Sequence, residues 1–195
     1  MGGFLYFYNM KVICLNLDHR VDRWASAQKE FAEQNLTVER FSAIENDDKF
    51  LSFNLSQHAI LKSITETTLV FEDDVYFVSD KLEEVLKYAP KDFDVLYLSG
   101  HVQAGLRRVN EYWWRCRSTH TTHSVIYTAK AAKYIYDRYN PHTDGIYDDY
   151  LFRVIQPTLR CYICKPFITA QKPGYSDLWQ RETDYGILYT QSKLL

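Results

Sequence analysis

Apolar and polar residues alternate in blocks along the chain, and the blocks predict strands and helices in turn. Short continuous apolar runs, as at residues 11–17 and 94–99, are typical of buried strands, whereas apolar residues three or four positions apart predict a helix over residues 21–35. The other predicted strands cover residues 38–41, 68–71, 124–128 and 161–167, the last being the final strand, and the other predicted helices cover residues 82–88, 129–139 and 147–155, with one more capped by Ser56. Residues 100–122 show no clear period. This order predicts an α/β fold with a mostly parallel sheet and helices on both faces.

Composition and charge narrow the class of protein. A chain of 195 residues with 46% hydrophobic residues fits one domain with a short C-terminal tail. The net charge of −2 gives no electrostatic case for a nucleic-acid partner. The apolar residues 1–8 lack the basic start of a signal peptide and are too few to span a membrane, so we expect no transmembrane segment. Cys161 and Cys164 lie three apart on a predicted strand and face opposite sides, which favours free cysteines in a reducing cytosol and a cytoplasmic protein, with peripheral membrane association left open.

Three consecutive carboxylates form the most informative feature of the chain. Glu72, Asp73 and Asp74 directly follow the apolar run of residues 69–71, so we place them where a buried strand leaves the sheet. In open α/β sheets, ligands bind at the carboxyl edge of the strands. Three acids at that edge repel one another unless a cation lies among them, and Mg²⁺ or Mn²⁺ takes carboxylate oxygens. The alternative is a solvated acidic turn.

Two arginines follow the first predicted strand. Arg20 and Arg23 lie about one helical turn apart at the start of the first predicted helix, where the helix dipole favours anions. A pair of guanidinium groups at such a crossing suits a diphosphate. The alternative is local pairing of Arg20 or Arg23 with Asp18 or Asp22 on the surface, and the residues alone favour neither.

A second pair of acids opens a later helix. Asp148 and Asp149 follow Gly145, and acids in a first helical turn are often only partners of the helix dipole. The functional alternative is a general base that takes a proton from an attacking hydroxyl. The chain has no HExxH motif, nucleophile elbow, P-loop or GxGxxG, which disfavours metalloproteases, serine hydrolases, P-loop kinases and dinucleotide enzymes.

Eight segments of the chain resemble, in order, the motifs of glycosyltransferase family 25, which contains bacterial lipooligosaccharide glycosyltransferases and collagen galactosyltransferases. The opening ICLNLDHRVDR at residues 13–23 resembles INLxxRxDR, and LVFEDDV at residues 69–75 resembles LILEDDV. The other similar segments lie at residues 40–44, 55–58, 94–98, 122–132, 148–151 and 166–178. The chain departs from the family where Phe53 and Asn54 replace a Gly-Cys pair and where Gln57 is inserted between Ser56 and His58.

The resemblance implies a single GT-A domain over residues 1–180, with a tail over residues 181–195. It implies an inverting transfer of a hexose from a nucleotide sugar, typically a UDP-sugar, to a glycan or other hydroxyl-bearing acceptor, with Mn²⁺ or Mg²⁺. Asp74 would hold the metal, with Glu72 or Asp73 assisting, and Glu72 would also reach the ribose. The nucleotide-binding residues would be Asn16, Arg20, Arg23, Ala43 and His58. Asp148 is the first candidate for the base and Asp149 the second.

Two other classes of function remain open from the sequence. A metal-dependent phosphodiesterase or nucleotidyl-type enzyme also needs clustered acids, although such sites usually draw acids from several strands. A degenerate transferase could also keep the fold and bind a nucleotide sugar without turning it over.

Overall fold

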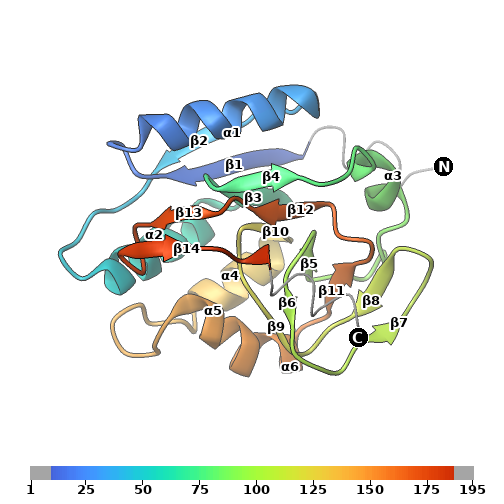
Figure 1. Ribbon diagram of the computed structural model, residues 1–195. Coiled ribbons are helices and arrows are strands. Elements are labelled where there is room, and N and C mark those ends of the chain that lie inside the picture. The colour runs from blue at the N-terminus through green and yellow to red at the C-terminus, as the bar shows by residue number, and fades with distance from the viewer. Residues whose placement is uncertain (1–9, 187–195) are drawn as a thin grey trace.

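The computed structural model describes residues 10–186, and a sheet of eight strands forms its centre (Figure 1). The strands of this sheet are β1 (Lys11–Asn16), β2 (Glu39–Ser42), β3 (Thr68–Glu72), β5 (Val95–Tyr97), β7 (Arg107–Arg108), β8 (Trp113–Arg115), β10 (Ser124–Tyr127) and β11 (Cys161–Cys164). Their order is β2-β1-β3-β10-β5-β11-β8-β7. Five strands, β1, β3, β5, β10 and β11, are buried along nearly their whole length, as their continuous apolar runs predicted.

The sheet is mixed, which corrects the prediction of a mostly parallel one. β1 runs parallel to β2 and β3, and β5 runs parallel to β11. β10, however, lies antiparallel between β3 and β5, and β8 lies antiparallel to β11 and β7. The described residues between β5 and β10 contain no helix. A strand that ran parallel to β5 would need a long crossover connection before it, usually with a helix. β10 instead enters the sheet from the edge at which β5 leaves it, and so runs antiparallel to β5.

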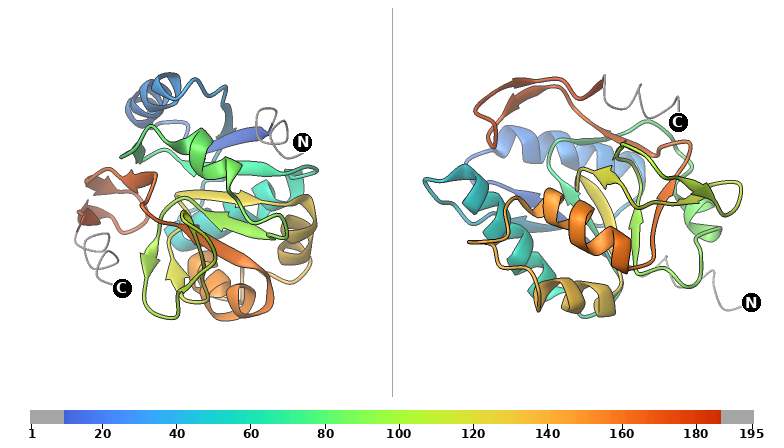
Figure 2. Two further views of the ribbon diagram at one scale, coloured as in Figure 1. Left: turned by 90° about the vertical axis from the view of Figure 1, so that its right-hand side faces the viewer. Right: turned by 90° about the horizontal axis from the view of Figure 1, so that it is seen from below.

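Helices cover both faces of the sheet, as predicted. On one face, α1 (Val21–Glu33) and α3 (Leu82–Lys87) pack against a core that includes Phe31, Phe71 and Leu86. The opposite face carries α2 (Lys49–Ser63), α4 (Ala129–Tyr136), α5 (Tyr147–Tyr150), the π-helical turn η1 (Leu151–Ile155) and α6 (Gln156–Thr158). Their core includes Ile60 and Ile135. The left-hand view of Figure 2 shows α1 above the strands and α5 below them.

The prediction that Ser56 caps a helix was wrong, because α2 begins earlier. Asp48 is the cap, and its carboxylate accepts hydrogen bonds from the backbone N–H groups of Phe50 and Leu51. Ser56 lies inside the helix, where its hydroxyl donates to the carbonyl of Ser52 and accepts from the N–H of Ile44, both at 2.8 Å.

Short strands fill regions in which the sequence showed no period. They are β4 (Val75–Phe77) with β12 (Thr169–Gln171), β6 (His101–Val102) with β9 (Thr119–His120), and β13 (Gly174–Ser176) with β14 (Arg181–Thr183). Strands of two or three residues are too short to show a period of two. The sequence therefore did not predict the four strands within residues 100–122, which are β6, β7, β8 and β9. The strand at residues 161–167 is therefore shorter than predicted and is not the final one. β14 uses the first residues of the predicted tail.

The four cysteines are free and buried, and Cys161 and Cys164 enter the cores on opposite faces of the sheet, as their spacing predicted. Across residues 10–186, no helix is both long and apolar enough to cross a membrane. The apolar residues 1–8 lie outside the described residues.

Candidate active site

A cavity of about 570 Å³ opens where β1 and β3 end, and residues 175–180 of the β13–β14 hairpin form part of its wall. Most of the predicted site residues line it, namely Asn16, Arg23, Ala43, Glu72, Asp73, Asp74, Asp148 and Asp149. Residues that are far apart in the sequence therefore meet at one edge of the sheet, which is the position at which open α/β sheets bind ligands.

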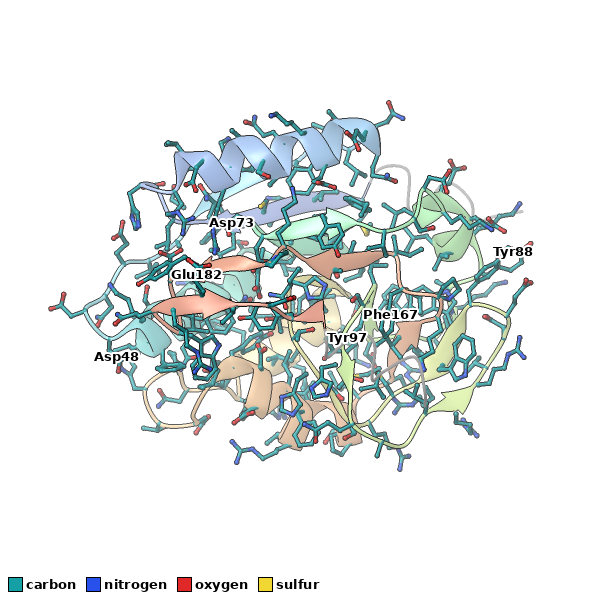
Figure 3. All side chains as sticks on the ribbon, viewed as in Figure 1. Asp48, Asp73, Tyr88, Tyr97, Phe167 and Glu182 are labelled. Carbon is teal, nitrogen blue, oxygen red and sulfur yellow. The ribbon has the colours of Figure 1, made fainter. Side chains whose placement is uncertain are left out.

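Asp73 is bound on both oxygens by the first strand and helix. The Asn16 amide donates to Oδ2 at 2.6 Å, and Nη1 of Arg23 lies 3.0 Å from Oδ1. Figure 3 shows Asp73 beneath the start of α1. Burial raises the pKa of Asp73, and Arg23 and Asn16 oppose that shift. Asp73 thus links β3 to β1 and α1, and Arg23 compensates its charge.

The two arginines hold the hairpin. Arg20 pairs with Asp22, with contacts of 2.9 and 3.0 Å, and with Asp177 of the β13–β14 hairpin. Arg23 donates to the carbonyl of Tyr175 and lies 3.8 Å from Asp177. The hydrogen bond from Arg20 lowers the pKa of Asp22 to about 2. Arg20 therefore pairs locally with Asp22, which is the alternative considered from the sequence. Arg20 does not line the cavity.

Glu72 and Asp148 meet at the hydroxyl of Thr122. Oγ1 of Thr122 lies 2.7 Å from Oε1 of Glu72 and 2.9 Å from Oδ1 of Asp148. The hydroxyl has one hydrogen and can donate it to only one of the two carboxyl groups. Burial, followed by the charges of Asp74 and Asp148, raises the pKa of Glu72 well above its usual range. Burial likewise raises the pKa of Asp148 to about 6, and hydrogen bonds from Thr122 and a backbone N–H oppose that shift.

Asp74 completes the acidic group on the cavity wall. The amide of Gln171 donates to its Oδ2 at 3.2 Å, and burial together with the charge of Asp73 raises the pKa of Asp74 to about 6. Within residues 10–186, no Lys, Arg or His side chain forms an ion pair with Glu72, Asp74 or Asp148. We call these three residues the unpaired acids.

The unpaired acids suit a hard divalent cation, because they offer carboxylate oxygens whose mutual repulsion a cation would relieve. In the described part of the chain, however, no group of three His, Cys, Asp or Glu side chains is already arranged to hold a metal ion. The oxygen donors are of the kind that Mn²⁺ or Mg²⁺ takes, but a bound ion would need further ligands from water or substrate.

Asp149 and His58 differ from the other predicted residues. Asp149 is 44% exposed at its side chain and lies 3.3 Å from Nη2 of Arg153 and 3.5 Å from Nδ1 of His120. His58 does not line the cavity, because it lies on the side of α2 that packs against α4. There its ring stacks on Tyr136 with 4.3 Å between centroids, and Nε2 lies 3.3 Å from the carbonyl oxygen of Tyr136.

Sequence reasoning assigned no role to several cavity residues. Thr122 and Gln171 contact the unpaired acids, and Asp177 contacts both arginines. All three fall within segments that resemble family 25, so the resemblance was the signal that could have drawn attention to them. Their residue types alone carry no such signal.

Comparison with known proteins supports the fold. No protein-family model and no curated protein sequence matches the chain. A solved glycosyltransferase involved in the glycosylation of the major capsid of PBCV-1 is similar with a TM-score of 0.56 at 9% identity, over 95% of this chain and 99% of that one. Weaker likenesses, too slight to bear on the fold, are to A197 from STIV (TM-score 0.47, 9% identity, 79% and 81% covered) and to a mannose-1-phosphate geranyltransferase from Thermus thermophilus (0.41, 10%, 83% and 75%). The chain thus has a glycosyltransferase-like α/β fold over nearly its whole length.

Proposed function

We propose that the chain is a metal-dependent glycosyltransferase of the family 25 type. It would move a hexose from a nucleotide sugar, with a UDP-sugar as the first choice, to a hydroxyl of a glycan or another acceptor. The observation that carries this proposal is the position of the unpaired acids at the carboxyl edge of a glycosyltransferase-like sheet. A leaving diphosphate needs its charge neutralised, and acids without a cationic partner provide a place for the cation that would do so.

Two of the unpaired acids have the chemistry to hold the cation. Asp74 and Glu72 would bind Mn²⁺ or Mg²⁺, which when bound supplies positive charge to the diphosphate. Asn16 at the end of β1, Arg23 in the first turn of α1 and Ala43 just after β2 would line the nucleotide. Arg23 can do this only while it also holds Asp73 and the hairpin, so its role is to orient as well as to attract.

Asp148 is the better of the two candidate bases. With a pKa of about 6, it is mostly ionised at pH 7 and is a stronger base than an ordinary aspartate. Its hydrogen bonds fix its orientation, as a base that takes a proton from an incoming hydroxyl requires. Asp149 is more exposed, and Arg153 lies beside it. In an inverting reaction, one such base is sufficient.

A thermal-shift screen tests the proposal. UDP-, GDP-, dTDP- and CMP-sugars are each added with Mn²⁺ or with EDTA, because a ligand that binds the folded state raises the melting temperature. We expect one nucleotide to stabilise the protein only with metal. Asp74→Asn should abolish that shift and sugar transfer while the fold survives, and Asp80→Asn, an exposed acid outside the cavity, should change neither. No shift with any donor, or full turnover by Asp74→Asn, would contradict the proposal.

A further inference from the structure

A strained turn beside Asp148 is not explained by the packing of the fold. Thr121 and Thr122 connect β9 to β10, and Thr121 has a φ of +81°, a conformation that is a clear outlier for a β-branched residue. The hydroxyl of Thr121 is also buried without a hydrogen-bond partner in the described structure. Strain and an unpaired polar group both lower stability, and they persist mainly where a function requires them.

The turn brings two donors to one carboxylate. The backbone N–H of Thr121 is close enough to Asp148 to lower its pKa, and the hydroxyl of Thr122 lies 2.9 Å from its Oδ1. The same hydroxyl lies 2.7 Å from Glu72, at the end of β3. Thr122 therefore touches both sides of the proposed reaction, the acid on the donor side and the base on the acceptor side. A carboxylate held by two neighbouring donors cannot rotate freely, so its remaining lone pairs point in a fixed direction.

We propose that the Thr121–Thr122 turn is a positioning element that fixes the carboxylate of Asp148 relative to Glu72, so that the base meets the nucleophile at the right distance and angle. This inference rests on the proposed function. Thr122 acts through its hydroxyl, and Thr121 acts through a backbone conformation that aims its N–H at the carboxylate. Much of the rate increase that a general base provides depends on its position, because a small displacement increases the distance over which the proton must move.

Hydrolysis of the donor by water gives an assay that needs no acceptor. In this reaction, the water oxygen attacks C1 of the sugar, the bond from C1 to the diphosphate oxygen breaks, and Asp148 takes the proton from the water. Free nucleoside diphosphate is the product that is measured. The donor is the one identified by the thermal-shift screen, and its affinity is measured separately by titration calorimetry.

Two substitutions at one position separate positioning from packing. Thr122→Val keeps the shape of the side chain and removes the hydroxyl, whereas Thr122→Ser keeps the hydroxyl and removes a methyl group. We expect Thr122→Val to lower kcat about tenfold to hundredfold, which is less than the roughly hundredfold to ten-thousandfold effect of a general base, because Asp148 itself is still present. Its KM, donor affinity and melting temperature should stay close to those of the wild type. Thr122→Ser should keep most of the activity. Thr158→Val, whose hydroxyl bonds only the carbonyl of Val154, is the matched control.

A double variant shows whether Thr122 acts through Asp148. If it does, adding Thr122→Val to Asp148→Asn causes no further loss of kcat, because the group being positioned has lost its function. A further loss, together with weaker donor or metal affinity, would instead show that Thr122 acts through Glu72 and would overturn the inference.

Thr121→Gly gives a second and independent test. Glycine adopts a positive φ without strain and removes the unpaired hydroxyl, but it also reaches many other backbone conformations and so no longer confines the N–H to the direction of Asp148. We expect an unchanged or higher melting temperature with a lower kcat, a combination that a purely structural residue would not give. If the wild type hydrolyses the donor and both Thr122→Val and Thr121→Gly keep its kcat, the inference about the turn is overturned but the proposed function is not. A wild-type protein that hydrolyses no nucleotide sugar would overturn the proposed function as well.

Discussion

His123 allows the packing behind the site to be tested without any substrate. Its side chain is fully buried, with Nε2 3.5 Å from Oγ1 of Thr169, and its backbone carbonyl accepts the hydrogen bond from the N–H of Glu72 at 3.0 Å. Burial lowers the pKa of His123 to about 3, so the side chain is neutral in the folded protein. The test compares the wild type with His123→Gln, whose side chain cannot take up a proton in this pH range.

The expected effect follows from proton uptake by the unfolded chain. Unfolded histidine titrates near about 6.5, so between pH 6.5 and pH 3 the unfolded state binds a proton that the folded state does not, and stability falls as the pH falls. At pH 5, about 1.5 pH units below the unfolded pKa, the loss is about 2 kcal/mol relative to pH 8. Asp74 and Asp148 act in the opposite sense, because their raised pKa values let the folded state take up protons first as the pH falls through 6.

The difference between the two proteins isolates the contribution of His123, since both carry the same carboxylates. Urea unfolding followed by tryptophan fluorescence at pH 8, 7, 6 and 5 gives the free energy of unfolding for each. His123→Gln should be less stable at pH 8 because its packing changes, yet it should lose about 2 kcal/mol less than the wild type between pH 8 and pH 5. Parallel pH curves for the two proteins would refute the burial argument.

Three further predictions concern the site and the core. Because the pKa of Asp148 is about 6, kcat for donor hydrolysis should fall about tenfold from pH 7 to pH 5, and Asp148→Asn should lack this acid limb; a flat wild-type profile would contradict the assignment of the base. Asp177→Asn should lower the free energy of unfolding by about 1 kcal/mol, measured in urea, because it removes the ion pairs of Asp177 with Arg20 and Arg23, and unchanged stability would show that these pairs contribute nothing. Trp113→Ala should cost about 3–5 kcal/mol in the same measurement, because the ring is fully buried and its Nε1 donates to the carbonyl of Val85 at 2.9 Å.

The sequence predicted which residues meet where β1 and β3 end, because the signals for these two strand ends are local. An apolar run that ends in charged residues marks both a strand and its exit from the sheet, and the carboxyl ends of parallel neighbours meet at one edge. β1 and β3 are such neighbours, and the hydrogen bond from Asn16 to Asp73 shows how closely their ends approach. These contacts follow from two short segments that form parallel neighbouring strands.

The start of α2 and the direction of β10 depend on contacts with distant parts of the chain, which no local sequence pattern reveals. The start of α2 was missed because the helix buries polar residues against other parts of the chain. Asn54, for example, donates to the carbonyls of Pro141 and Gly145 and accepts from the N–H of Tyr147. A buried asparagine interrupts the apolar period, and its partners lie about 90 residues away. The direction of β10 was missed for a similar reason, since the short strands before it show no period.

The distribution of charge divides the cavity into two parts, and this division has a thermodynamic consequence. At one part, Arg23 pairs with Asp73 and Asp177, and Arg20, which does not line the cavity, also pairs with Asp177. At the other part are the unpaired acids, which would repel a free diphosphate and would hold a lone cation with few ligands.

Under the proposed function, each ligand would supply what the other lacks, because a cation would screen the acids and a diphosphate would offer it further oxygen ligands. We expect metal and nucleotide to strengthen each other's binding by the same factor, as linkage requires. Titration of UDP with and without Mn²⁺, and of Mn²⁺ with and without UDP, measures the two factors. Both should fall toward one in Asp74→Asn, whereas equal affinities in the wild type with and without the other ligand would show that the unpaired acids bind no metal beside the nucleotide.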